Sequence, residues 1–220
     1  MDLKEAMVRR HSVRQYKDIP LSDELIAALQ QEIDAINREA DLHFQLVVNE
    51  PKAFDSFMAH YGRFEGVKNY FALVGKRCEN FDEKIGYYGE RLVLKAQQLG
   101  LFTCWVALTY KKQPEMFKVE KGEKFSLVIS VGHGRNKGLV RRSKTVEQVS
   151  NASVNTPEWF HEGVKAALTA PTAVNQQKFF LTYDNGKVKA KAGFGPYAKM
   201  DLGIVKYHFE LGAERAVEWE

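Results

Sequence analysis

The chain has 220 residues, a formal net charge of +4 and 45% hydrophobic residues, a composition typical of a globular protein that can bury a sizeable core. Lysines and arginines form no block with interleaved aromatics, so we expect no nucleic-acid partner. No apolar run is long enough to cross a membrane, and we expect no membrane association. The two cysteines, Cys78 and Cys104, offer neither a disulfide framework nor metal-ligand spacing, and the charged N-terminus has no apolar signal region. We therefore expect a cytoplasmic protein without a metal.

Local patterns predict the elements of the first part of the chain. Ser22 precedes apolar residues at helical spacing and is the expected N-cap of a helix. A long amphipathic run ends at Gly100, in a C-cap position, and the apolar residues that follow it up to Trp105 are expected to form a turn. The predicted elements are a helix from Ser22, strands over 43–48 and 69–75, a helix over about 83–99 and a strand over 125–132.

The second part contains two helices and a hairpin. Thr156 is the expected N-cap of a helix with Pro157 at its first position, and this helix should stop near Ala170. The sequence Asp184-Asn185-Gly186 between two β-prone runs indicates a hairpin. A last helix is predicted over about 199–214.

This order of elements predicts an α+β fold, with a mostly antiparallel sheet covered by helices. Each half of the chain gives the order helix, strand, strand, long helix. We therefore expect two lobes with pseudo-twofold symmetry, over residues 1–150 and 151–220.

Arg10, Ser12 and Arg14 alternate near the N-terminus, so in an extended segment their side chains would point the same way. Two guanidiniums with a hydroxyl between them suit a phosphate or a ribityl chain. On residue type alone, a solvated basic N-terminus is an equally open reading.

Two further segments offer binding groups. The basic, glycine-rich loop 132–144 can hold an anion, although it could also be a solvated loop. The polar turn over 170–177 closes a helix, where backbone groups are free to meet a ligand, but it could be an ordinary helix end. Cys104 fits a packed thiol better than a nucleophile.

Together these segments resemble the FMN-dependent nitroreductase family, in particular a subgroup with a rearranged order of motifs. The Arg-x-Ser-x-Arg signature of the family is matched at every fixed position, and 94–105 and 170–177 are similar to two further family motifs. Phe102, where the family commonly has glycine, and Thr172, where it has serine, are departures. The resemblance implies that FMN is contacted by Arg10, His11, Ser12, Arg14, the backbone of Ala107 and Leu108, Arg142 and Lys144 (with Arg141 as an alternative), Pro171, Thr172 and Asn175.

The motif at 170–177 follows a helix of the second half, whereas in the family it follows the first helix. Family dimers hold FMN at the subunit interface, with this motif supplied by the second subunit. The displacement therefore implies a fused pseudo-dimer, a monomer with one complete FMN site. Its first half would supply all the site residues up to Lys144, and its second half Pro171, Thr172 and Asn175.

The implied activity is electron transfer from NAD(P)H through FMN to a small electron-poor acceptor such as a nitroaromatic or a quinone. The sequence nominates no acid or base residue. Phe102, Ala107 and Leu108 could crowd the acceptor pocket, which leaves open a flavin-binding protein without turnover. A degenerate member that lacks flavin is a third possibility.

Overall fold

The structure is a computed structural model, and it describes residues 1–219. These residues form two compact units. Unit 1 comprises residues 1–8, residues 82–91 and the chain from Val140 to the end of the described part, and unit 2 comprises 9–81 and 92–139. Each unit is assembled from stretches that are distant in the sequence.

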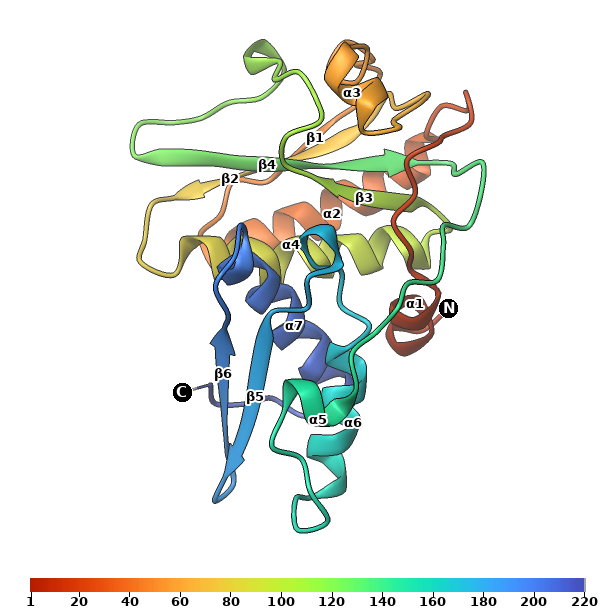
Figure 1. Cartoon of the computed structure of the whole chain (residues 1–220). Helices are drawn as coiled ribbons and strands as arrows, with labels where there is room; N and C mark the ends of the chain where they lie inside the picture. Colours follow the sequence, from red (N-terminus) through yellow and green to blue (C-terminus); the bar gives the residue numbers. More distant parts are fainter. Residues whose placement is uncertain (220) are drawn as a thin grey trace. The chain divides into compact units, whose positions relative to one another are not determined.

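Unit 2 is built on a four-stranded antiparallel sheet (Figure 1). The strand β2 (Tyr70–Lys76) lies inside the sheet, and its residues from Tyr70 to Gly75 are buried. The strands follow the order β1-β2-β4-β3, where β1 is Gln45–Val47, β3 is Phe102–Val106 and β4 is Glu123–Gly132.

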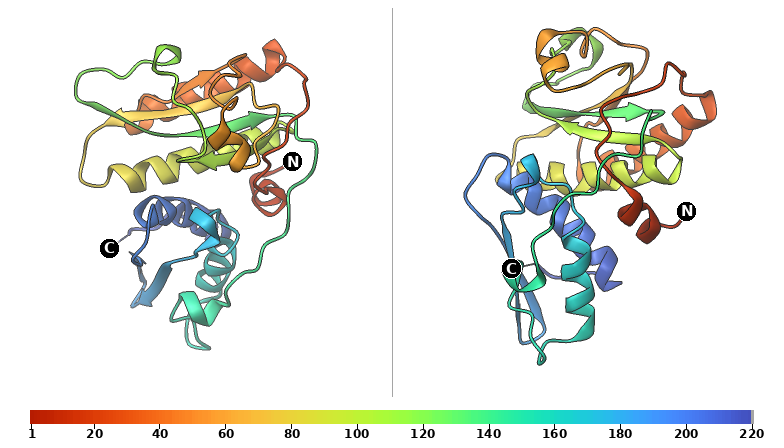
Figure 2. Two further views of the ribbon diagram at one scale, coloured as in Figure 1. Left: turned by 45° about the horizontal axis from the view of Figure 1, so that its top comes forward. Right: turned by 45° about the vertical axis from the view of Figure 1, so that its right-hand side comes forward.

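Helices cover both faces of this sheet. Helix α2 (Asp23–Ala40) lies along one face, and the short helix α3 (Phe57–Tyr61) lies on the other (Figures 1 and 2). The Ser22 hydroxyl accepts a hydrogen bond from the Leu25 N–H at 3.4 Å, which confirms the predicted N-cap. A 3-10 turn, η1 (Pro114–Met116), precedes β4.

Unit 1 combines helices with a β-hairpin. Helices α6 (Glu158–Ala167) and α7 (Ala198–Ala213) pack together, and α7 also packs on the hairpin strand β6 (Figures 1 and 2). The remaining elements that begin in this unit are α1 (Leu3–Arg9), α5 (Val146–Val149), η2 (Ala173–Asn175), β5 (Phe179–Asp184) and β6 (Lys187–Ala192).

The hairpin between β5 and β6 turns at Asn185 and Gly186, as predicted. Both residues have positive φ, 49° and 89°. A two-residue turn with positive φ at both positions matches the twist of the flanking strands. The Asn-Gly pair is thus the local reason that the chain reverses here.

Helix α4 (Phe81–Gln98) meets α7 at two glycines. A Cβ built on Gly86 would lie 2.0 Å from the carbonyl oxygen of Met200, and one on Gly203 would lie 1.9 Å from that of Glu83. Neither distance is possible for real atoms. The two backbones therefore approach each other closely, and only glycine fits at the crossing.

Two local predictions are wrong. Residues Phe102–Val106, expected as a turn, form the edge strand β3, where Cys104 pairs with Ser130 of β4. Thr156 does not cap α6: its hydroxyl donates to the Ser153 carbonyl at 2.7 Å, and Pro157 takes the N-cap position. Pairing with β4 decides the first case, and a hydrogen bond within the turn over 153–156 decides the second.

The predicted fold class, a mixed α+β fold with antiparallel sheets covered by helices, is confirmed. The bounds of the compact units differ from the expected lobes at 1–150 and 151–220, and the pseudo-symmetric lobes stay a prediction. Within the described residues, none of the helices combines the length and the apolar character that a membrane crossing requires.

Candidate functional site

The segment that carries the first motif runs extended beside the edge strand β3. Ser12 forms a parallel bridge with Thr103, and the Val13 N–H donates to the Thr103 carbonyl at 3.0 Å. This pairing places Ser12 opposite Thr103, next to Cys104 in the strand. An extended segment was the geometry that the alternation of Arg10, Ser12 and Arg14 required.

The two arginines of the motif and Ser12 all affect the pKa of one side chain, the Cys104 thiol. Burial raises the pKa of the Cys104 thiol, and the charge of Arg14, the Ser12 hydroxyl and the charge of Arg10 oppose this rise in that order. Cys104 is 3% exposed and Arg10 is 4% exposed. Two positive charges and a hydroxyl therefore favour the thiolate of Cys104, and burial outweighs them.

Tyr16, which the sequence analysis did not single out, anchors this segment from within the core. Its phenol donates to the Val13 carbonyl at 2.7 Å and lies 2.9 Å from the Ser130 hydroxyl. Ser130 in turn donates to the Cys104 carbonyl at 3.4 Å. The network ties the motif to β3 and β4, and so limits how far Ser12 can move.

The loop that follows β4 packs against the segment that carries the first motif. The Arg135 N–H donates to the Gln15 carbonyl at 2.9 Å. A Cβ on Gly138, whose φ is +78°, would lie 2.5 Å from the Cβ of His11. This close approach leaves His11 partly buried under the loop.

Ala107 and Leu108 follow directly after β3. Leu108 is 71% exposed, and Ala107 is partly buried. A Cβ on Gly62, at the end of α3, would lie 2.6 Å from the Cβ of Thr109, so this loop packs against α3. The Leu108 side chain therefore faces away from the packed interior.

The turn that carries the second motif belongs to unit 1. Val174, Asn175 and Gln177 all have positive φ, at 46°, 55° and 44°. The left-handed region is costly for a β-branched residue, and Val174 is 92% exposed, so packing of its side chain does not offset that cost. Strain of this kind persists only where the surrounding structure fixes it, and it is common at binding sites.

Asn175 contributes an unsatisfied acceptor to this turn. Its Nδ2 donates to the Arg142 carbonyl at 2.9 Å. Its Oδ1 is buried and accepts no hydrogen bond within the part of the chain that the structure describes. A buried acceptor without a donor costs free energy, and a ligand N–H would remove that cost.

The basic residues at 141–144 lie against the same turn. The Arg141 guanidinium donates to the carbonyls of Thr169 and Ala170, at 2.6 and 3.0 Å, and closes the end of α6. The Lys144 ammonium donates to the Gln177 carbonyl at 2.7 Å, whereas Arg142 is exposed. Arg142 and Lys144 therefore belong to the same compact unit as Asn175, and the phosphate contact expected of them stays a prediction.

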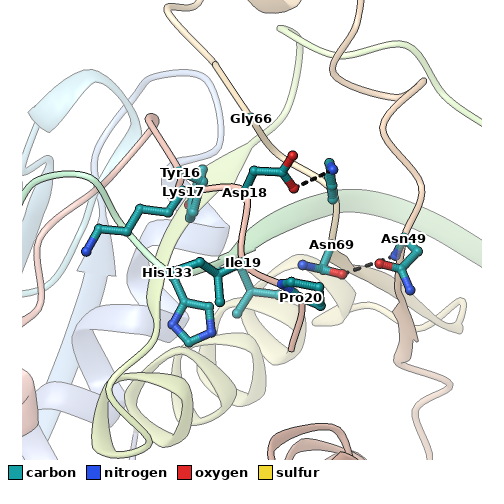
Figure 3. Close-up of a pocket in the computed structure, with 12 residues that line it drawn as sticks. Tyr16, Lys17, Asp18, Ile19, Pro20, Asn49, Gly66, Asn69 and His133 are labelled. Carbon is teal, nitrogen blue, oxygen red and sulfur yellow. Dashed lines mark hydrogen bonds and ion pairs between the residues drawn. The ribbon is translucent and has the colours of Figure 1, made fainter. Parts of the chain in front are cut away.

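A separate small cavity lies in unit 2 beside Tyr16 (Figure 3). Lys68 pairs with Asp18 at 2.5 Å at its edge, and the backbone N–H of Asn49 donates to the side-chain oxygen of Asn69 at 3.1 Å. None of the site residues named from the sequence lines this cavity. It is thus not part of the expected site.

Comparison with known proteins gives the family. The sequence model described as "Putative TM nitroreductase" matches residues 2–213, nearly the whole chain. The chain belongs to this family. No curated protein matches the chain.

Solved structures of nitroreductases share the fold. A structure described as a putative nitroreductase from Thermotoga maritima superposes with a TM-score of 0.67 at 20% identity, covering 96% of this chain and 83% of its own. A nitroreductase family protein from Streptococcus pneumoniae superposes with a TM-score of 0.54 at 13% identity, over 67% of this chain and 98% of its own.

A third structure, a putative nitroreductase from Desulfovibrio desulfuricans in complex with FMN, has a TM-score of 0.52 at 19% identity and covers 71% of this chain and 98% of its own. The Desulfovibrio desulfuricans and Streptococcus pneumoniae structures are each covered over 98% of their length. The matched part is 71% and 67% of this chain, respectively.

Proposed function

We propose that this member of the nitroreductase family is an FMN-dependent oxidoreductase. It takes electrons from NAD(P)H and passes them to a small electron-poor acceptor, such as a nitroaromatic or a quinone. The observation that carries the proposal is the extended segment of Arg10, Ser12 and Arg14, which the Ser12–Thr103 bridge fixes beside β3, because two charged donors and a hydroxyl on one fixed segment suit a phosphorylated, hydroxylated ligand. A family relative from Desulfovibrio desulfuricans was solved in complex with FMN.

The residues present fit FMN on a second ground. The buried Oδ1 of Asn175 needs a hydrogen-bond donor, and the flavin ring carries an N–H at its pyrimidine edge. FMN is an anion, and the arginines of the first motif are permanently charged donors. The family resemblance assigned Asn175 and the two arginines to FMN binding.

Bound FMN would supply the redox chemistry, and the protein would supply binding, orientation and charge. Arg10 and Arg14 would hold the negative charge of the phosphate and of the pyrimidine edge. Ser12, fixed by its bridge to Thr103, would bind a ribityl hydroxyl. Asn175 would accept from the ring, and Pro171 and Thr172 would shape the turn beside it.

The colour and bleaching of the purified protein test this proposal. We expect a yellow protein that NADH or NADPH bleaches and that a quinone returns to yellow. A yellow protein that neither nicotinamide bleaches would instead be a flavin-binding protein without turnover. A colourless protein that takes up no added FMN would contradict the proposal.

Arginine substitutions test the binding residues. Arg10→Ala and Arg14→Ala should each weaken FMN binding by about 1.5–3 kcal/mol, the value of a hydrogen bond to a charged group. Arg38→Ala, at an exposed position of α2, is the matched control and should leave the affinity unchanged. FMN affinity measured by flavin fluorescence checks this, and wild-type affinity in both variants would refute the role assigned to the motif.

A further inference from the structure

The strained turn over 172–177 is held by a carboxylate from another element. Asp201 lies in the first turn of α7 and is 5% exposed. Its two oxygens accept the backbone N–H of Ala173 at 3.0 and 3.1 Å, and one of them accepts Gln176 Nε2 at 2.7 Å. The carboxylate therefore hydrogen-bonds the turn at the residue before Val174 and at the residue after Asn175.

The far end of the turn is held in a different way. The Gln177 N–H donates to the Thr172 hydroxyl at 3.1 Å, and the Gln177 side chain accepts the Lys144 N–H at 2.8 Å. Between these two attachments lies Asn175, with its buried and unsatisfied Oδ1. Asparagine tolerates the left-handed region, but Val174 and Gln177 adopt it at a cost that the attachments offset.

Asp201 is an unusual choice for a purely structural role. Both groups that donate to it, the Ala173 N–H and the Gln176 amide, are neutral. Burial raises the pKa of Asp201 to about 6, although these two hydrogen bonds oppose the rise. A buried carboxylate held by neutral donors is costly, and such groups are concentrated at functional sites.

We propose that Asp201 is a positioning residue for FMN binding: its carboxylate fixes the 172–177 turn in the strained form that presents Asn175 Oδ1 to the flavin. This inference rests on the proposed function. It adds to that function a residue on α7 that does not itself contact the flavin.

Asp201→Asn tests the inference because it keeps the shape of the side chain. The amide oxygen is neutral and therefore a weaker acceptor than the carboxylate, and the amide NH2 group, which only donates, replaces the oxygen that accepts only the Ala173 N–H. In the FMN-free protein, the amide hydrogens of 173–177 should exchange about tenfold faster than in wild type, with the rest of unit 1 unchanged. FMN should bind about tenfold more weakly, which corresponds to the loss of one hydrogen bond to a charged group.

Three variants sharpen the test. Asp34→Asn, an exposed carboxylate on α2, is the matched control and should change neither measurement. Gln176→Ala removes one donor and leaves the carboxylate in place, so it serves if Asp201→Asn fails to fold; it should loosen the same segment and weaken FMN binding less. In an Asn175→Ala background, Asp201→Asn should weaken FMN binding by less than about twofold, because both changes act through one contact.

The outcomes separate this inference from the proposed function. Wild-type protein that takes up no FMN defeats the proposed function. Wild-type protein that binds FMN, with unchanged exchange and affinity in Asp201→Asn, overturns the role of Asp201. Exchange that rises evenly over unit 1, or full additivity with Asn175→Ala, also overturns it, because either result would mark Asp201 as structural only.

Discussion

Cys104 illustrates how its surroundings decide what a residue can do. The charges of two arginines and a hydroxyl lower the pKa of this thiol, an influence that usually favours a reactive thiolate. Burial nevertheless has the larger effect, and the pKa of the thiol is raised. We conclude that Cys104 is a neutral core residue beside the segment that carries Arg10, Ser12 and Arg14.

Thiol labelling checks this conclusion. Cys78 is exposed and Cys104 is buried, so a native sample at neutral pH should react rapidly with a thiol reagent at one position and slowly at the other. Cys78→Ser should abolish the fast phase, and unfolding should restore a second thiol. Fast labelling of native Cys78→Ser protein would show that Cys104 is accessible and ionised.

At this scale the sequence was informative about residue types and less so about partners. The alternation of Arg10, Ser12 and Arg14 predicts an extended segment, and the segment is extended. Nothing in the local sequence indicates that the Lys144 ammonium donates to Gln177, or that Asp201 holds a turn 25 residues or more before it. Such contacts join distant stretches, so a local pattern cannot reveal them.

The crossing of α4 and α7 shows the same rule for whole elements. Helix propensity favours alanine over glycine by about 1 kcal/mol. Gly86 and Gly203 nevertheless occupy the crossing, because a side chain on either would overlap a carbonyl of the opposite helix. The close packing is worth more than the propensity that the two glycines lose.

Gly203→Ala measures this balance. A Cβ there would lie 1.9 Å from the Glu83 carbonyl oxygen, so the helices must move apart. Overpacking of this kind costs about 1–3 kcal/mol, and we expect a lower midpoint of urea unfolding. Lys199→Ala, at an exposed position of α7, should leave the midpoint nearly unchanged. A midpoint that rises in Gly203→Ala would mean that propensity dominates and that the crossing is loose.

Elements with a strong local signal could be predicted, and elements defined by distant pairing could not. The Ser22 cap and the Asn185-Gly186 turn are encoded by neighbouring residues. The strand β3 is five residues long and owes its conformation to pairing with β4, so its sequence alone suggested a turn. Thr156 has the side chain of an N-cap, but its hydroxyl hydrogen-bonds Ser153 and His161 instead.

At the scale of the molecule, the chain is longer than some of the nitroreductase structures that share its fold. The Streptococcus pneumoniae structure is matched over 98% of its length by 67% of this chain, so about a third of the chain has no counterpart there. The fused pseudo-dimer stays a prediction, in which residues 170–177 supply the motif of the second subunit. The Thermotoga maritima structure, which is matched over 96% of this chain, shows that the longer form exists elsewhere in the fold.

The mass of the flavin-loaded protein tests the pseudo-dimer. If one chain supplies both Arg10 and Asn175 to its own FMN, the yellow species should sediment at the monomer mass of 25.1 kDa and carry one FMN per chain. At a fixed excess of free FMN, dilution of the protein should then leave the fraction of flavin-loaded chains unchanged, because binding at a site within one chain does not depend on protein concentration. A mixture of Arg10→Ala and Asn175→Ala proteins is the control. If FMN sites were shared across a dimer, a mixed dimer would contain one site with both residues intact, and that site would bind FMN tightly. Separate monomers have no such site. Restored binding, or flavin carried only by a species of twice the mass, would contradict the fusion.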